Sequence, residues 1–337
     1  MDAVEALERI AYVLERGRAE SHRVQAFRRA ADVVRELSPS DLAERARTGT
    51  LAELPGIGPK TAAVITEALA GREPEYLRHV EAEHPSITTG AGGTLRAELR
   101  GDLHSHSDWS DGGSSIDVMA RAAQEQGHEY WALTDHSPRL TVAHGLDADR
   151  LLAQLDVIDE LNETLAPFRI LTGQEVDILE DGSLDQRDDI LARLDVVIAS
   201  VHSKLRMEER AMTQRMIAAL ASPHVDILGH CTGRLIAGRG RPESTFDAEL
   251  VFAAASHLDK AIEINCRPER LDPPRRLLRL ALEQGCKVSI DTDAHAPGQL
   301  EWLPYGCERA AECDVPVASV VNTWPVEDLR AWTASHS

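Results

Sequence analysis

Between residues 99 and 337 the sequence alternates seven short apolar runs with segments of helical periodicity, and this alternation restricts the possible folds most. Strands that alternate with helices build a parallel sheet, because each helix carries the chain back to the starting edge. At this length the expected form is a closed sheet with the helices outside. Seven units are one fewer than a regular barrel of this type needs, so we predict an α/β fold with a distorted seven-stranded (βα)7 barrel.

Every one of the seven runs ends in side chains that can hold a metal ion or take part in catalysis. They are His104, His106, Asp135, His136, Glu175, His202, His230, Glu263, Asn265, Asp291, Asp293 and His295. The carboxyl ends of parallel strands meet on one rim of a barrel, where barrel enzymes carry their active sites. A single histidine at a strand end is usually structural, but its repetition at successive strands favours a metal centre.

The donor types indicate which ions the rim would hold. Side chains two apart on a strand point the same way, so His104 and His106 can reach one ion. Asp293 and His295 share that spacing. Imidazole and carboxylate donors without thiolates suit Zn²⁺, Mn²⁺ or Fe²⁺ in an open site. The donors outnumber the ligands of one ion, so we expect two or three divalent metal ions.

Residues 1–72 have a different character, because they are helical throughout. Apolar residues recur at helical spacing in VEALERIAYVLE and RVQAFRRAADVVREL. The turn PGIG then precedes another helix, whose free N–H groups would face outward at its positive end and fit a phosphate. The same turn could simply connect two helices. The candidate DNA contacts are Gly56, Gly58, Lys60 and Thr61.

The formal net charge of −20 argues at first against a nucleic-acid partner. Its distribution weakens that objection, since residues 1–72 hold 11 Lys+Arg and 11 Asp+Glu, whereas residues 73–337 hold 25 and 45. Part of the acidity of the second segment belongs to the predicted metal ligands, and bound ions would neutralise it. The charge is therefore compatible with DNA binding through the neutral helical segment.

Each part of the chain resembles a known family on these motifs. The N-terminal helices with AFRRAADVV and PGIG resemble the helix-hairpin-helix domain of bacterial family X DNA polymerases. The motifs HSH, TDH, GQEVDI, SVHS, GHCTGR and DTDAH resemble those of the PHP (polymerase and histidinol phosphatase) domain. The loops GHCTGRLIAGRGR, EINCRPERLD and DAHAPGQLEWLPYG are more similar to the PHP domain of those polymerases than to free-standing histidinol phosphatases.

The resemblance implies a domain division and a ligand set. The expected domains are 1–72, a small all-α helix-hairpin-helix domain that binds DNA; 73–98, a linker; and 99–337, a PHP phosphoesterase barrel. The family implies a first ion on His104, His106, Glu175 and Asp293, and a second on a bridging Glu175 with His202 and His230. A third ion would lie on Asp111, His136 and His295. Glu263 and Asp291 are expected to orient the histidines rather than to bind metal.

Two features expected of a polymerase or a lyase are missing from the sequence, and this limits the activities that we expect. Segment 73–98 is too short for a polymerase palm, since domains usually need about 50 residues or more, so we expect no polymerase activity. Lys60 is the only lysine before Lys204, which argues against a Schiff-base lyase.

We expect a metal-dependent phosphoesterase that acts on DNA ends, as a 3′–5′ exonuclease or a 3′-phosphatase in DNA repair. A hydroxide that two or more metal ions activate would attack the phosphorus. Arginines of the rim loops would bind the phosphate, with Arg234 and Arg267 foremost among a set that also includes Arg239, Arg241 and Arg270. The alternatives are a small-molecule phosphatase of the histidinol-phosphatase type and a non-catalytic DNA-binding scaffold, against which the complete ligand set argues.

The expected partner is DNA, gapped or with a free 3′ end, together with a repair polymerase or ligase. No run of 18 apolar residues suggests a membrane span, and the first residues lack the features of a signal peptide. The five cysteines are scattered, which favours reduced thiols over a disulfide framework. We therefore expect a cytoplasmic protein with no membrane partner.

Overall fold

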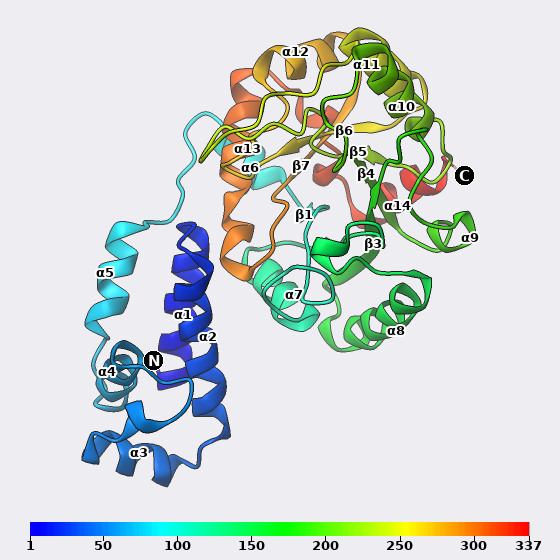
Figure 1. The fold of residues 1–337 in the computed structure, drawn as a ribbon. Coiled ribbons are helices and arrows are strands. Elements are labelled where there is room, and N and C mark those ends of the chain that lie inside the picture. Colours follow the sequence, from blue (N-terminus) through cyan, green and yellow to red (C-terminus); the bar gives the residue numbers. More distant parts are fainter. Residues whose placement is uncertain (337) are drawn as a thin grey trace. The chain divides into compact units, whose positions relative to one another are not determined.

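The computed structural model describes residues 1–336 and divides the chain into two compact units (Figure 1). The first comprises Met1–Ile87 with Pro297–Glu301, and the second comprises Thr88–Ala296 with the described residues from Trp302 onward. None of the described helices combines the length and the apolarity that a bilayer span requires.

The first unit is entirely helical, as predicted. It holds α1 (Ala3–Arg16), α2 (Ser21–Glu36), α3 (Pro39–Thr48), the short 3₁₀ helix η1 (Leu51–Glu53), α4 (Pro59–Leu69) and α5 (Glu75–Glu83). Helix α1 begins at a capping box, in which Asp2 accepts from Glu5 N and the Glu5 side chain accepts from Asp2 N. Its apolar face, with Leu7 and Ile10, is fully buried in the core of this unit.

The second unit is a seven-stranded parallel sheet in sequential strand order, which confirms the predicted barrel. Its strands are β1 (Gly101–Asp102), β2 (Tyr130–Leu133), β3 (Arg169–Asp177), β4 (Val196–Ser200), β5 (Ile227–Leu228), β6 (Ala261–Asn265) and β7 (Lys287–Asp291). Strands β2, β4 and β6 are buried along their whole length, as expected for a parallel sheet covered on both faces.

Helices surround this sheet on the outside (Figure 1). They are α6 (Gly93–Glu98), α7 (Ile116–Glu125), α8 (Ala148–Leu165), α9 (Asp188–Leu191), α10 (Glu209–Leu220), α11 (Ala248–His257), α12 (Arg275–Glu283), α13 (Leu303–Glu312) and α14 (Val326–Ala334). The 3₁₀ helices are η2 (Thr141–Ala143), η3 (Pro297–Trp302), η4 (Val317–Ser319) and η5 (Val321–Thr323). Apolar faces of α10, α11 and α12 pack on β4, β5 and β6 in one core cluster.

The barrel closes between β1 and β7 without a strand ladder. A single bridge joins Ser105 to Ala294. Leu103 N donates to Asp291 Oδ1 at 2.8 Å, Thr292 N donates to Asp102 Oδ1 at 3.2 Å, and the side chain of Asn322 adds further bonds. Asn322 Oδ1 accepts from Ile290 N at 2.7 Å, and its Nδ2 donates to Gly101 O at 3.3 Å and to Asp291 Oδ1 at 2.8 Å. Side-chain bonds of Asn322, Asp102 and Asp291 therefore supplement the single bridge where an eighth strand would lie.

The segment expected to be a linker is partly folded. It contains α5, which belongs to the first unit, and α6, which packs against α13 in the second. Gly92 N donates to Glu308 Oε1 on α13 at 3.1 Å. The two units meet in sequence at residues 87 and 88, inside the 73–98 segment.

Candidate metal centre

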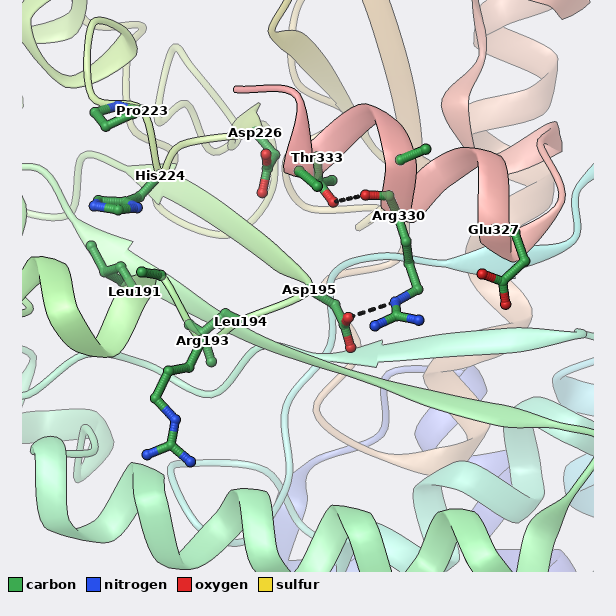
Figure 2. A pocket seen from close by; sticks show the side chains of 13 residues that line it. Leu191, Arg193, Leu194, Asp195, Pro223, His224, Asp226, Glu327, Arg330 and Thr333 are labelled. Atoms are coloured by element: carbon green, nitrogen blue, oxygen red, sulfur yellow. Dashed lines mark hydrogen bonds and ion pairs between the residues drawn. The ribbon is translucent and has the colours of Figure 1, made fainter. Parts of the chain in front are cut away.

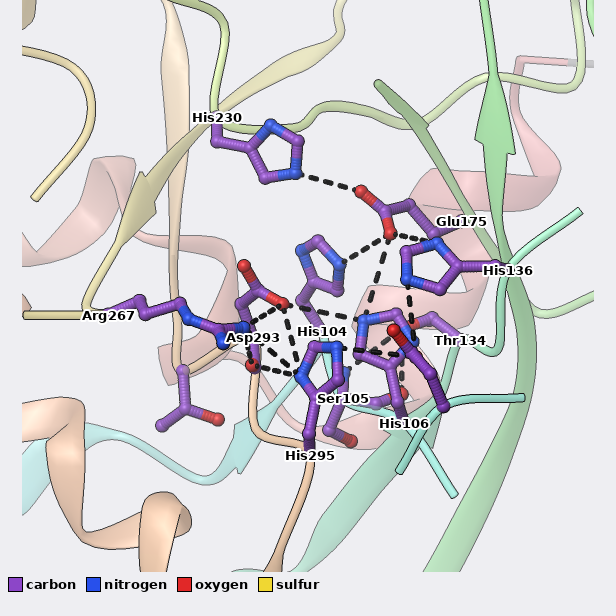
Figure 3. Close-up of polar contacts among 12 residues, drawn as sticks. His104, Ser105, His106, Thr134, His136, Glu175, His230, Arg267, Asp293 and His295 are labelled. Atoms are coloured by element: carbon purple, nitrogen blue, oxygen red, sulfur yellow. Dashed lines mark hydrogen bonds and ion pairs between the residues drawn. The ribbon is translucent and has the colours of Figure 1, made fainter. Parts of the chain in front are cut away.

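The nine residues predicted as metal ligands gather at the carboxyl ends of the strands. His104 and His106 follow β1, His136 follows β2, Glu175 lies on β3, His202 and His230 follow β4 and β5, and Asp293 and His295 follow β7. Asp111 lies in the loop between β1 and α7. Figure 3 shows several of these imidazoles directed at the Glu175 carboxylate.

The residues form three sets, and within each set the donor atoms all lie within 4.8 Å of one another. The sets are His104, His106 and Glu175; His136, Glu175 and His202; and His106, Asp111, His136 and His295. Glu175 belongs to two of these sets, which is the place of a bridging carboxylate. His230 and Asp293 lie outside the three sets but contact them. His230 Nε2 is 2.9 Å from Glu175 Oε1, and Asp293 Oδ1 is 3.5 Å from His106 Nε2.

The buried nitrogens of this ring test whether the residues fit metal ions. Within residues 1–336, His104 Nε2 and both ring nitrogens of His106 make no hydrogen bond, although both side chains are fully buried. An unsatisfied buried polar atom costs about 1–3 kcal/mol, which a metal–nitrogen bond would remove. The donors are imidazoles and carboxylates without a thiolate, a set that suits divalent ions of the zinc, manganese and iron type. The residues therefore fit such ions.

Two carboxylates lie beside the Nδ1 atoms of ring histidines. Glu263 Oε1 lies 2.6 Å from His104 Nδ1, and Asp177 Oδ1 lies 3.4 Å from His202 Nδ1 and accepts from His202 N at 3.1 Å. The hydrogen bond of Glu263 to His104 fixes the tautomer of that ring and leaves its other nitrogen for a metal ion. Glu263 thus lies where an orienting group is expected.

Sequence reasoning missed Asp177, although its spacing of two from Glu175 places both side chains on the same side of β3. Asp291, by contrast, was expected to orient a histidine. Its Oδ1 accepts from Leu103 N at 2.8 Å and from Asn322, so it binds groups of the barrel closure instead.

The loop that carries Asp111 is held by Asp135. Asp135 accepts from Ser107 N at 2.8 Å and from Ser107 Oγ at 2.6 Å, and Gln154 donates to it at 2.7 Å. The loop then turns so tightly that a Cβ on Gly112 would lie 2.6 Å from the Ser107 carbonyl carbon.

This turn brings Asp111 Oδ1 to 3.5 Å from His136 Nε2 and 3.4 Å from His295 Nε2. Asp293 has a left-handed φ of 54°, a conformation that aspartate tolerates better than most residues. Its N–H donates to His104 O at 2.9 Å, which ties the loop after β7 to β1.

Charges within the ring keep its carboxylates ionised. Burial alone would raise the pKa of Glu175, but the neighbouring His202 and His104 outweigh it and hold that pKa well below its ordinary value. Burial would also raise the pKa of Asp293. The neighbouring Arg267 and His106 outweigh this effect, and that pKa too is well below its ordinary value. Both carboxylates are therefore available as anionic ligands at neutral pH.

The imidazoles divide into two groups. Burial lowers the pKa of His106 well below its ordinary value, and burial with Arg270 lowers that of His230 to about 3, so both rings are neutral. Burial would also lower the pKa of His104, but the charges of Glu263 and Glu175 outweigh it and raise that pKa well above its ordinary value. A bound cation would therefore compete with a proton for His104 Nε2.

Two arginines adjoin Asp293, and a third predicted one does not. Arg267 lies 3.5 Å from Asp293 Oδ1 and 3.3 Å from His295 Nδ1, and Arg270 Nε lies 3.3 Å from Asp293 Oδ2. Arg234 instead donates to the backbone carbonyls of Arg270, at 3.0 Å, and Leu271. These contacts use Arg234 to hold the loop after β6, so Arg270 rather than Arg234 accompanies Arg267 at the ring.

The predicted DNA contacts surround the start of α4 in the helical unit. Gly58 N donates to Thr61 Oγ1 at 2.9 Å, and Thr61 is buried, so its side chain caps the helix. Gly56, with φ of 93°, and Lys60 are exposed, and Lys60 Nζ lies 4.4 Å from the ring centroid of Tyr76. The exposed groups of this turn are therefore backbone and one ammonium, both suited to a phosphate.

A cavity of about 470 Å³ lies elsewhere, beside the residues that precede β4 and β5 (Figure 2). Three of its charged groups are paired: Arg330 binds Asp195 at 2.8 Å, and His336 Nδ1 lies 2.7 Å from Asp226 Oδ1. None of the nine predicted ligands lines it.

Known protein families match both parts of the chain. The family described as a helix-hairpin-helix domain matches residues 1–73, and the family described as a PHP domain matches residues 102–271, as the motifs predicted. The chain is 43% identical over 235 residues to the DNA polymerase/3′-5′ exonuclease PolX of Bacillus subtilis, a match that covers 70% of this chain and 41% of the relative. It thus spans about two fifths of the length of that relative.

The chain is also 30% identical over 232 residues to a probable phosphatase of Acetivibrio thermocellus, covering 66% of this chain and 90% of the relative. A crystal structure of histidinol phosphate phosphatase from Lactococcus lactis, complexed with zinc, L-histidinol and phosphate, matches with a TM-score of 0.44 at 18% identity. That match covers 63% of this chain and 92% of the other. Since a PHP model matches half of the sequence and a relative of 30% identity is covered almost completely, the chain belongs to the PHP-domain family of metal-dependent phosphoester hydrolases.

Proposed function

We propose that this protein hydrolyses phosphoester bonds at DNA ends, as a 3′–5′ exonuclease or a 3′-phosphatase in DNA repair. One observation carries the proposal: a single chain joins a PHP ring of imidazoles and carboxylates to a helix-hairpin-helix unit with an exposed PGIG turn. A phosphoesterase that carries a unit suited to the DNA backbone acts most economically on DNA.

The proposed ligand sets follow the strand ends. The first ion would lie on His104, His106, Glu175 and Asp293, the second on Glu175, His202 and His230, and the third on Asp111, His136 and His295. Bound Zn²⁺, Mn²⁺ or Fe²⁺ would supply positive charge for the phosphoryl oxygens and lower the pKa of a bound water.

The chain's own side chains bind the substrate and keep the ring in order. Arg267 and Arg270 adjoin Asp293, where two guanidinium groups can take phosphoryl oxygens and the negative charge that grows on them. Glu263 holds the proton of His104 on Nδ1, so Nε2 stays directed at the ring centre. Asp111, about one third exposed, lies on the solvent side of the ring and is open to an incoming end.

The relatives support two substrates. The name of the Bacillus subtilis relative includes a 3′-5′ exonuclease, and its match with this chain favours DNA. The Acetivibrio thermocellus relative, covered over 90% of its length, is named a probable phosphatase and favours the alternative of a small phosphate ester. The helix-hairpin-helix unit supports DNA, gapped or 3′-ended, as the proposed substrate, and a repair polymerase or ligase is the proposed partner that completes the repair.

The test uses the full chain with Mn²⁺ and a 5′-labelled gapped duplex that ends in a 3′-phosphate, with Asp293→Ala as the inactive control. A ladder of shorter products identifies an exonuclease, and a single mobility step without shortening identifies a 3′-phosphatase. Turnover of p-nitrophenyl phosphate with an unchanged oligonucleotide would contradict the proposal and favour the small-ester alternative.

A further inference from the structure

A rigid hairpin, residues 232–241, follows His230, and we call it the rim hairpin. Leu235 and Arg241 exchange two backbone hydrogen bonds of 2.9 and 2.8 Å. At the tip, Gly240 N donates to Ala237 O at 3.1 Å, and Gly238 and Gly240 have φ of 64° and 67°. Glycine adopts these left-handed angles without strain, so the sequence allows this tight turn.

The rim hairpin is tied to the loop that carries the arginines of the metal centre. Ile236 N donates to Glu269 O at 2.7 Å, and Arg234 Nε donates to Arg270 O at 3.0 Å. Arg270 itself contacts Asp293. Because His230 precedes the hairpin and Arg270 lies against its base, the hairpin borders the ring on the side of β5 and β6.

Two side chains at the tip are exposed to solvent. Ile236 is 54% exposed, which is unusual for a large aliphatic residue in a defined turn. Arg239 is exposed, and within residues 1–336 its guanidinium makes no hydrogen bond or ion pair. The hairpin contains Arg234, Arg239 and Arg241 but neither Asp nor Glu, although residues 73–337 as a whole are strongly acidic.

This combination fits a polynucleotide strand better than a small ester. A small phosphate ester needs only the ions and the two arginines beside Asp293. An unpaired guanidinium next to an exposed aliphatic side chain offers a contact to a neighbouring phosphate and an apolar surface for a sugar or base. The positive charge of the hairpin complements a strand that the acidic surface around it would repel.

We propose that the rim hairpin is a strand-binding element that selects polynucleotides over small phosphate esters. Arg239 binds a phosphate outside the scissile bond, and Ile236 packs against the adjoining sugar or base. The inference rests on the proposed action at DNA ends and adds to it the residues that determine substrate choice.

The test compares wild type, Ile236→Ala, Arg239→Ala and the double variant on two kinds of substrate. These are the 5′-labelled gapped duplex and two small esters, p-nitrophenyl phosphate and bis(p-nitrophenyl) phosphate, all with Mn²⁺. The measured quantity is the ratio of kcat/KM for the duplex to kcat/KM for the small ester that is turned over. We expect this ratio to fall about tenfold or more in the double variant, mainly through KM for the duplex.

The matched control is Leu250→Ala with Arg121→Ala, which removes an exposed aliphatic residue and an exposed arginine from α11 and α7. It should leave the ratio within about twofold, and Arg239→Lys should restore most of what Arg239→Ala loses. An equal fall on both kinds of substrate would overturn the inference, because the hairpin would then only support the ring. An unchanged ratio in the double variant would also overturn the inference. If the wild type does not cleave the duplex at all, the proposed function on which the inference rests is already refuted.

Discussion

Glu263 shows how one buried carboxylate can control the metal centre without binding a metal. It faces His104 Nδ1 at 2.6 Å, and its other oxygen accepts from His230 N. Glu263→Gln keeps the volume but removes the charge and directs an NH₂ group at one of these two donors. We expect metal affinity to fall about 10- to 100-fold, measured by calorimetric titration of the apoprotein with Mn²⁺. Glu249→Gln on the exposed face of α11 is the control, and equal affinity in both variants would contradict this role.

His128 makes the stability of the barrel depend on pH. It is 4% exposed, and burial with the charge of Arg96 lowers its pKa to about 3 from an ordinary 6.5. Below pH 6.5 this imidazole is therefore protonated in the unfolded chain but neutral in the folded one. Its contribution to the stability of the fold is complete above pH 6.5 and is lost as the pH falls from 6.5 towards 3. Between pH 7 and pH 5 the free energy of unfolding of the wild type should fall by about 2 kcal/mol more than that of His128→Leu. Denaturant unfolding at the two pH values measures this difference. His257→Leu, at an exposed histidine, should keep the wild-type pH dependence; if both variants do so, His128 is not the cause.

At this scale the sequence predicts the positions of the candidate ligands better than the contacts that support them. His104, His106 and Asp293 could be predicted because strand alternation and the barrel rim determine where they point. The task of Arg234 depends on the path of the loop after β6, which no local pattern encodes. The tie between Asp135 and the loop of Asp111 likewise joins two segments only in the folded chain.

Among the elements, the closure between β1 and β7 depends on Asn322. Asn322→Ala removes its bonds to Ile290, Gly101 and Asp291, and so loosens the two strands that lead to His104 and Asp293. We expect lower thermal stability together with about tenfold weaker Mn²⁺ binding by calorimetry.

The matched control for the closure is Asn162→Ala. Asn162 makes the same pair of backbone bonds, to Ile170 N at 2.7 Å and Ile170 O at 3.0 Å, where α8 meets the start of β3. It should lower thermal stability but not Mn²⁺ affinity. Equal metal affinity in the two variants would show that Asn322 supports the fold only.

The strands and their order could be predicted because each run is apolar, bounded and followed by a helix. The closure could not, since η5 lies some thirty residues beyond β7 and joins the barrel through the Asn322 side chain and one isolated bridge, Val288 to Val320, rather than through a full strand. Helices α5 and α6 lie in the 73–98 segment, where polar residues and glycines obscure the apolar positions Leu77, Val80 and Leu95 that pack inward.

For the whole molecule, the division of charge between the two units bears on the proposed binding of DNA. The barrel carries most of the acidity, whereas residues 1–72 of the helical unit are neutral and contain the exposed turn with Lys60 that we propose to bind phosphate. Lys60→Ala should therefore weaken binding to the gapped duplex and lower the slope of log Kd against log salt by about one. Fluorescence anisotropy from 50 to 300 mM salt measures both, with Ca²⁺ in place of Mn²⁺ to keep the duplex intact.

Arg35→Ala is the control for this measurement, because Arg35 is exposed on α2 and already pairs with Asp32 at 2.6 Å. It removes the same charge from the same unit but leaves the PGIG turn unchanged, so the salt slope should stay at the wild-type value. If Lys60→Ala also leaves the slope unchanged while the wild type binds the duplex, the phosphate contacts lie outside this turn. The rim hairpin would then be the first place to seek them, since it holds an exposed arginine for which residues 1–336 provide no acidic partner.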